Sequence, residues 1–289
     1  MELQYVPLPN GETIAYRKRA GGDCTVILVH GNMTSSKHWD VLLEALSPQF
    51  TLIALDLRGF GDSTYQKRIT KIKDFSDDLK AFFDEIGQSR FHLIGWSTGG
   101  AVCMQFVADY PGYCEKLILL ASASTRGYPI YATKPDLRRR LITIQDIERD
   151  GKTLVMQGLY DSGNRIGLKA VWESSIYTHS KPEAARFEEY VDDMLTQRNL
   201  ADVYHALNHF NISTHSNGLN EGTGQAQEIR IPTLILSGDR DLVVPKSMTE
   251  EIIEDIGQHA VHVELENTGH SPLIDCPAKL TSVIEEFLE

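Results

Sequence analysis

The sequence has no long apolar run, few cysteines and no excess of positive charge. No apolar stretch approaches the roughly 18 residues that a membrane-spanning helix needs. Residues 1–5 show neither the basic segment nor the apolar run of a secretory signal peptide. The formal net charge of −12 disfavours nucleic acid and anionic membranes as partners, because both repel an acidic surface. We therefore expect a cytoplasmic protein with no membrane span and no nucleic-acid partner.

The chain also lacks the patterns that hold metals and phosphate-bearing cofactors. Its four cysteines do not have the short spacings of a metal site. They are expected to be buried free thiols, at positions 24, 103, 114 and 276. No glycine-rich loop of the kind that cradles phosphate groups is present. We therefore predict no cofactor and no bound metal.

Apolar strands alternate with amphipathic helices along much of the 289 residues. Continuous aliphatic runs at 25–29 and 51–55 are typical of strands buried on both faces of a sheet. Such alternation indicates βαβ units, and hence an α/β fold with a mostly parallel sheet flanked by helices. Eight strands are predicted, over residues 3–8, 13–19, 25–29, 51–55, 91–94, 116–121, 232–238 and 260–265.

The alternation stops between residues 124 and 230, which we call the helical insertion. We predict a core formed by residues 1–123 and 231–289 and a helical cap, or lid, formed by the insertion. Candidate helices lie near 135–149, 153–157, 167–175, 182–197 and 200–208. The run Arg138, Arg139 and Arg140 is expected to be a solvated helix face, with a basic patch that grips a carboxylate substrate as the alternative.

Residues 95–100, Gly-Trp-Ser-Thr-Gly-Gly, stand between a predicted strand and a predicted helix. A Gly-x-Ser-x-Gly pattern in that position is typical of a nucleophile elbow, with Ser97 at its apex. Small residues on both sides let strand and helix approach while the serine takes a strained backbone conformation. Trp96 is expected to line the substrate pocket or to pack beneath it. The backbone N–H of Thr98 is a candidate donor to an oxyanion.

A serine hydroxyl needs an adjacent base, usually a histidine oriented by a carboxylate. His270 follows the last predicted strand, so it is expected at the same edge of the sheet as Ser97. The preceding strand ends before Asp239 and Asp241. These residues, taken alone, leave open which aspartate orients the histidine.

Over most of its length the chain resembles the α/β-hydrolases. Their Gly-Asp-x-Asp-x-x-Val-Pro motif matches residues 238–245, and the resemblance implies that Asp241 is the catalytic acid while Asp239 braces the turn. It also implies that the backbone N–H of Asn32, after His-Gly at the end of an early strand, is the second oxyanion donor. Met33 beside it is a candidate pocket residue.

Two further loops carry the resemblance. The loop at residues 30–36 is similar to that of haloalkane dehalogenases, but their nucleophile is aspartate, and here it is Ser97. Dehalogenation is therefore disfavoured. The family's Asp-x-Arg-Gly-x-Gly-x-Ser pattern occurs at residues 56–63 and is expected to hold loops beside the active site.

These residues predict a serine hydrolase that cleaves a small-molecule carboxylic ester through an acyl-enzyme on Ser97. The elbow is also similar to those of cofactor-free haloperoxidases, which form peracids, and of intracellular polyhydroxyalkanoate depolymerases. Carbon–carbon bond hydrolases with the same triad are a further alternative. A ligand-binding receptor of this fold is the alternative outside enzymes.

Overall fold

The computed structural model describes residues 2–133 and 139–289. One eight-stranded sheet has the order β1-β2-β4-β3-β5-β6-β7-β8. The pairs among β3 to β8 are parallel, whereas β2 pairs antiparallel with β1 and β4. This confirms the predicted α/β class and the mostly parallel sheet. The strands are β1 (Leu3–Pro7), β2 (Thr13–Arg19), β3 (Cys24–Val29), β4 (Phe50–Leu55), β5 (Phe91–Trp96), β6 (Cys114–Leu120), β7 (Thr233–Gly238) and β8 (Ala260–Leu265).

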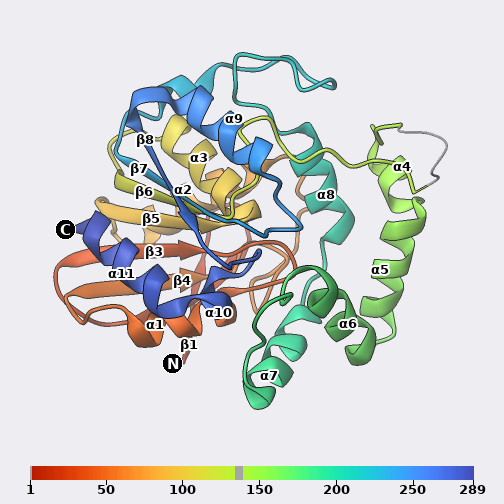
Figure 1. Ribbon diagram of the computed structural model, residues 1–289, viewed down its shortest axis with the longest axis horizontal. Helices are drawn as coiled ribbons and strands as arrows, with labels where there is room; N and C mark the ends of the chain where they lie inside the picture. The colour runs from red at the N-terminus through yellow and green to blue at the C-terminus, as the bar shows by residue number, and fades with distance from the viewer. Residues whose placement is uncertain (1, 134–138) are drawn as a thin grey trace.

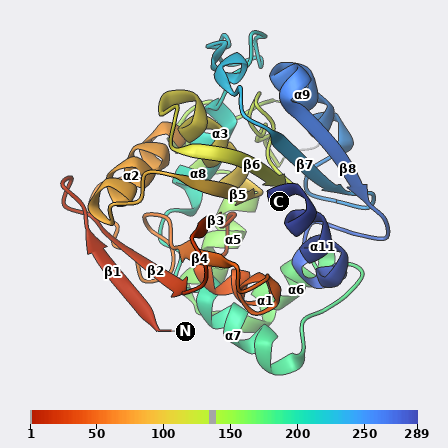
Figure 2. The same cartoon turned by 90° about the vertical axis from the view of Figure 1, so that its left-hand side faces the viewer.

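Helices cover both faces of the sheet, which explains why its central strands are apolar on both sides (Figure 1). On one face lie α2 (Ile72–Glu85), α3 (Thr98–Asp109) and α9 (Lys246–Ile256). On the other lie α1 (Asp40–Ala45), the short α10 (Pro272–Asp275) and α11 (Pro277–Leu288). Figure 2 shows the sheet twisting between these layers from β1 at one edge to β8 at the other.

The helical insertion lies between β6 and β7. It contains α4 (Ile144–Glu148), α5 (Gly151–Asp161), α6 (Arg165–Ser175), α7 (Ala184–Met194) and α8 (Leu200–His209). In Figure 1 these helices lie at one side of the molecule, beyond the carboxyl ends of the central strands. The helical character predicted for this segment is present. Its division from the core as a separate domain stays a prediction.

Within the predicted helix over 135–149, the described residues 139–143 are not helical. The helix begins only at Ile144, because Thr143 caps it by accepting a hydrogen bond from the Asp146 N–H at 3.1 Å. Just before this helix, Arg140 forms an isolated antiparallel bridge with Tyr131. Residues 134–138, which include Arg138, lie outside the described residues.

The predicted solvated arginine face is also wrong at Arg140. Its side chain is half-buried and donates through Nε to the Asn208 Oδ1 at 2.8 Å. Further bonds run to the backbone carbonyls of Asn208 and Asn217. Arg140 therefore ties three segments of the insertion together, while Arg139 is exposed.

Two other expectations concern thiols and membranes. All four cysteines are free, and Cys103 and Cys114 are buried, where burial raises the pKa of both thiols. Within residues 2–133 and 139–289, no helix combines the length and apolar character needed to cross a bilayer.

Candidate active site

The order of the strands brings two predicted site loops together. From β3 the chain passes to β4 on one side and then to β5 on the other, so β3 pairs with both strands. The loops that follow β3 and β5 therefore leave the carboxyl edge as neighbours, the usual place for a ligand site in such a sheet. A Cβ added at Gly31 would lie only 3.0 Å from the Ser97 Cβ. Close packing of these loops accounts for a glycine at position 31.

Ser97 occupies a strained turn between β5 and α3. Its backbone has φ 55° and ψ −117°, a conformation that costs a residue with a side chain about 1–3 kcal/mol. Backbone hydrogen bonds from the Ser97 N–H to Leu120 O at 2.9 Å and from the Ala123 N–H to Ser97 O at 3.2 Å hold the turn. A Cβ at Gly99 would lie 2.2 Å from the Val29 carbonyl oxygen. The small residues of the motif are therefore required by packing.

The structure brings His270 and Asp241 together. His270 is buried on the loop after β8, and its Nδ1 lies 2.8 Å from Asp241 Oδ2. The other oxygen of Asp241 accepts the N–H groups of Val243 and Val244, at 2.7 and 2.9 Å. This turn fixes the carboxylate, so that its free oxygen faces the imidazole.

Asp239 has a different position. Its Oδ1 accepts the Thr268 N–H at 2.9 Å, and backbone hydrogen bonds of this kind lower the pKa of the Asp239 carboxyl. The side chain therefore braces the turns after β7 and β8 against each other. Only Asp241 of the two candidate aspartates contacts His270.

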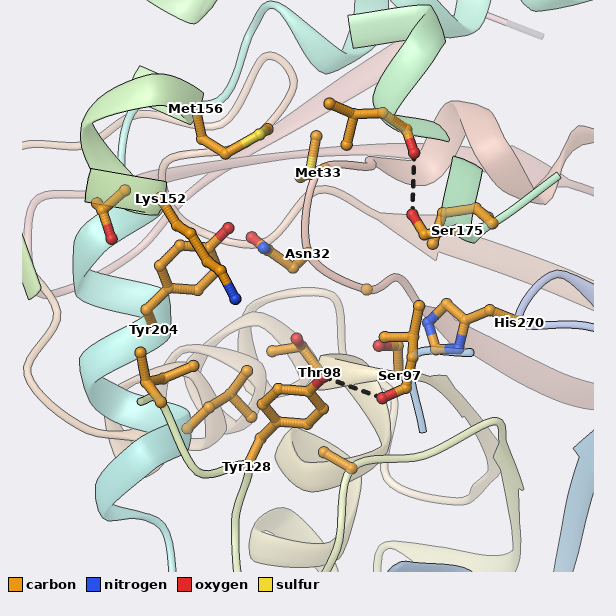
Figure 3. A pocket seen from close by; sticks show the side chains of 18 of the residues that line it. Asn32, Met33, Ser97, Thr98, Tyr128, Lys152, Met156, Ser175, Tyr204 and His270 are labelled. Carbon is orange, nitrogen blue, oxygen red and sulfur yellow. Dashed lines mark hydrogen bonds between the residues drawn. The ribbon is translucent and has the colours of Figure 1, made fainter. Parts of the chain in front are cut away.

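Ser97, Thr98 and His270 line a pocket of about 420 Å³ between the sheet edge and the helical insertion. Figure 3 shows the serine and the imidazole at one side of this pocket. Asn32, Met33 and Trp96 also line it, as do residues of α5, α6 and α8 such as Met156, Trp172, Tyr204 and Leu207. Six of the seven predicted site residues therefore line one cavity, and the seventh, Asp241, contacts His270.

Trp96 has a second contact that the sequence does not reveal. Its Nε1 donates to the carbonyl of His270 at 2.9 Å, and the side chain is buried. The residue before the nucleophile therefore anchors the backbone of the histidine loop. The two residues are 174 positions apart, so no local pattern indicates the pairing.

A side chain of the helical insertion holds the loop that contains Asn32. Gln197 donates through Nε2 to Asn32 Oδ1 at 2.7 Å and accepts the Met33 N–H on Oε1 at 3.1 Å. Met33 itself has a left-handed backbone, with φ 61°. Gln197 is buried and is bonded on its own side by Asn199 and Tyr160. A lone glutamine in a segment without a recognisable motif gives no sequence signal for this role.

His30 and Asp56 connect the loops behind the site. The His30 Nε2 accepts the Leu57 N–H at 2.9 Å, which requires a neutral ring, and Nδ1 bonds Gly31 O at 2.7 Å. Burial lowers the pKa of His30 to about 4. Asp56 accepts the N–H groups of Ser36 and Asp62 at 2.8 and 2.9 Å, and burial raises the pKa of its carboxyl to about 6. As expected, the 56–63 loop supports its neighbours.

The chain belongs to the alpha/beta hydrolase fold family, whose model matches residues 25–277. It is 27% identical over 269 residues to an AB hydrolase superfamily protein, YisY, of Bacillus subtilis (strain 168), which covers 91% of this chain and 90% of the relative. It is 22% identical to a 2-hydroxy-6-oxononadienedioate/2-hydroxy-6-oxononatrienedioate hydrolase of a Pseudomonas species, over 99% of this chain and 96% of the relative. An esterase structure from Exiguobacterium antarcticum shares the fold with a TM-score of 0.75 and 18% identity, over 99% of this chain and 98% of the esterase.

We predict that the neutral His30 makes the protein less stable in acid. The unfolded chain binds a proton at this residue below pH about 6.5 and the folded chain only near pH 4, so stability falls as the pH is lowered between these values. From pH 7 to pH 5 the loss is about 2 kcal/mol. Urea unfolding of the wild type and of His30→Gln at both pH values measures the difference.

The variant comparison is needed because Asp56, with its raised pKa, acts in the opposite direction over part of this range. His30→Gln should show a smaller loss of stability in acid than the wild type, by about 2 kcal/mol. His179→Gln, at an exposed position, is the matched control and should keep the wild-type loss. Equal losses in all three proteins would contradict the prediction.

We also predict that Gln197→Met loosens the loop of Asn32 and Met33. The variant loses the two bonds to this loop together with those to Asn199 and Tyr160, which should lower the free energy of unfolding by about 4 kcal/mol and speed hydrogen exchange at the Met33 amide. Gln157→Met removes a single bond to Asp161 on the surface of α5 and serves as the control. Unchanged exchange at Met33 in Gln197→Met would show that the glutamine does not hold the loop.

Proposed function

We propose that the chain is a serine hydrolase that cleaves small-molecule carboxylic esters through an acyl-enzyme on Ser97. The observation that carries this proposal is the 2.8 Å contact of His270 Nδ1 with Asp241, in a pocket that His270 shares with Ser97. Asp241 accepts a hydrogen bond from Nδ1–H, which leaves Nε2 of the neutral imidazole free to act as a base. Nucleophile, orienting carboxylate and base thus follow β5, β7 and β8 at one sheet edge.

In the proposed first half-reaction, Ser97 Oγ attacks the ester carbonyl carbon while His270 Nε2 takes the hydroxyl proton. The negative oxygen that forms lies between the backbone N–H groups of Asn32 and Thr98, and the N-terminus of α3 adds its positive dipole. The intermediate then collapses. The bond to the alcohol oxygen breaks, and this oxygen takes the proton from His270, which releases the alcohol and leaves the acyl group on Ser97.

In the second half-reaction, a water oxygen attacks the acyl carbon and gives a proton to His270. The bond from this carbon to Ser97 Oγ breaks, and the serine recovers its proton from the imidazole. One ester and one water thus become one carboxylic acid and one alcohol. Asp241 stabilises the imidazolium that forms in each half without taking up the proton itself.

We further propose that residues 124–230 act as a cap that selects the substrate. Met156 on α5, Trp172 on α6 and Leu207 on α8 contribute apolar side chains to the pocket. Because the insertion builds this wall, changes there should alter which acyl or alcohol groups fit without altering the chemistry at the serine.

Carbon–carbon bond hydrolysis is the second candidate. It is favoured by the similarity of the full chain to the Pseudomonas hydrolase, whose named substrate is an oxo-dienedioate rather than an ester. A series of nitrophenyl esters of increasing acyl length, run beside 2-hydroxy-6-oxononadienedioate, separates the two reactions. Faster turnover of the dienedioate than of every ester would favour the second candidate.

The first test is Ser97→Ala. It should abolish ester turnover and labelling by a fluorophosphonate, because the proposed mechanism takes its attacking oxygen from Ser97. Circular dichroism and the unfolding midpoint should show an intact fold. Near-normal turnover in this variant would refute the assignment, and an unlabelled wild type would favour a ligand-binding receptor.

The second test compares two neighbouring aspartates. Asp241→Asn should lower kcat by about 10³- to 10⁴-fold, since the amide no longer holds the imidazole in the tautomer that leaves Nε2 free. Asp239→Asn is the matched control, because that carboxylate accepts the Thr268 N–H and pairs with Arg240 at 3.8 Å, whereas His270 contacts Asp241. It should keep most of the activity. Equal losses in both variants would contradict the assigned acid.

A further inference from the structure

The pocket contains an ammonium group that the proposed ester chemistry does not use. Lys152 lies in the first turn of α5 and lines the same cavity as Ser97 and His270. Figure 3 shows its side chain directed from the helix into the cavity, on the side opposite Ser97 and His270. The pocket lining also includes apolar side chains, among them Met156, Val171 and Trp172.

The described residues provide no partner for this charge. Two other lysines of the insertion have carboxylate partners: Lys169 is paired with Glu188 and Lys181 with Glu173, the latter at 2.9 Å. Within residues 2–133 and 139–289, neither an ion pair nor a hydrogen bond of the Lys152 ammonium is found. Lys152 is exposed, so its ammonium at this edge of the pocket is open to solvent and accessible to an anionic ligand.

Asp150 is the one carboxylate among the described residues that line the pocket, and it is already hydrogen-bonded. Asp150 caps α5, and its oxygens accept from the Thr133 N–H at 2.8 Å, the Thr133 hydroxyl at 2.6 Å and the Lys152 N–H at 3.0 Å. These bonds hold the carboxylate at the helix start. The Asp150 carboxylate is therefore hydrogen-bonded to Thr133 and to the Lys152 backbone, and no ion pair with the Lys152 ammonium is found within residues 2–133 and 139–289.

A second donor ends in the same part of the pocket. The Tyr204 side chain on α8 also lines the cavity and lies beside Lys152 in Figure 3. Burial raises the pKa of Tyr204 to about 12, so near neutral pH the phenol keeps its proton and can donate it to an oxygen.

We propose that Lys152 binds a carboxylate on the substrate, so that the enzyme acts on esters that carry an acid group at the end remote from the reacting carbonyl. This proposal rests on the ester hydrolase function proposed above. In this proposal the reacting carbonyl of the substrate lies at Ser97. The carboxylate of the substrate lies across the pocket, at the Lys152 ammonium and the Tyr204 hydroxyl. Lys152 acts in specificity and takes no part in bond cleavage.

Charge favours a carboxylate over a phosphate as the bound group. The whole chain carries a net charge of −12, which repels anions, so binding one requires a local cation. Lys152 is the only lysine or arginine among the pocket-lining residues that the structure describes. One ammonium balances a singly charged carboxylate, whereas a phosphate monoester carries up to two charges and is usually held by several donors.

The test uses two substrates that differ only in charge, 4-nitrophenyl hydrogen adipate and its methyl ester, 4-nitrophenyl methyl adipate. The measured quantity is the ratio of kcat/KM for the anion to kcat/KM for the neutral ester, at fixed ionic strength. Lys152→Met should lower this ratio about tenfold, the usual effect of losing a hydrogen bond to a charged group. Lys152→Glu should lower it further, and Lys152→Arg should keep most of it.

Lys181→Met is the matched control, because this lysine of the insertion is exposed and paired with Glu173 outside the pocket. It should leave the ratio unchanged. A ratio that stays within twofold of the wild type in both Lys152→Met and Lys152→Glu overturns the proposal.

A binding measurement separates this proposal from the hydrolase function. In Ser97→Ala, calorimetry should show monomethyl adipate binding about tenfold more tightly than dimethyl adipate, and adding Lys152→Met should remove the difference. If neither nitrophenyl ester is hydrolysed, the hydrolase proposal fails and this measurement alone decides the anion site. Equal binding of the two adipates overturns the site, and tighter binding of hexyl phosphate than of hexanoate overturns the choice of carboxylate.

Discussion

The left-handed backbone of Ser97 is the constraint on which the site depends. A backbone φ of 55° is unfavourable for serine, so packing and hydrogen bonds of the surrounding chain must offset its conformational energy. The glycines at 95 and 99 let β5, α3 and the end of β3 approach closely enough to fix the turn. The parallel pairing of β5 with β3 and β6 on its two sides leaves the turn no room to relax. Strain at one residue is therefore balanced by the packing of three strands.

The other site residues depend on the same sheet edge. His270 and Asp241 follow β8 and β7, and Trp96, the last residue of β5, bonds the carbonyl of His270. The helical insertion is tied to this edge by buried polar contacts. Asp193 on α7 accepts the Ser35 hydroxyl at 2.5 Å, just after the loop of Asn32, and Gln197 holds that loop directly. A change in the insertion can thus reach the loop of Asn32, the proposed backbone donor, without touching the serine.

Strand–helix alternation and the elbow could be predicted because both are local patterns. The alternation predicted the class of the sheet, and Gly-x-Ser-x-Gly located the turn from six adjacent residues. The two aspartates after β7 show where local reasoning stops. By residue type and position, either Asp239 or Asp241 could orient the catalytic histidine. The resemblance to a family was needed to choose Asp241. The structure supplies the physical difference: the Val243 and Val244 N–H groups hold one oxygen of Asp241, whereas the turn at Thr268 occupies Asp239.

The residues that could not be predicted act through distant partners. Gln197 and Asn32 are 165 positions apart, and no sequence pattern indicates that the two side chains are in contact. The prediction for the basic residues was wrong for the same reason, because their partners are distant in the sequence. The run of arginines at 138–140 predicted a solvated, charged face. Arg140 instead donates hydrogen bonds to Asn208 and Asn217. Lys152, an isolated lysine between polar and apolar residues, instead faces the pocket. Whether a cation is available to a ligand is decided by the carboxylates and carbonyls that the fold places around it, and a count of charges along the chain does not contain that information.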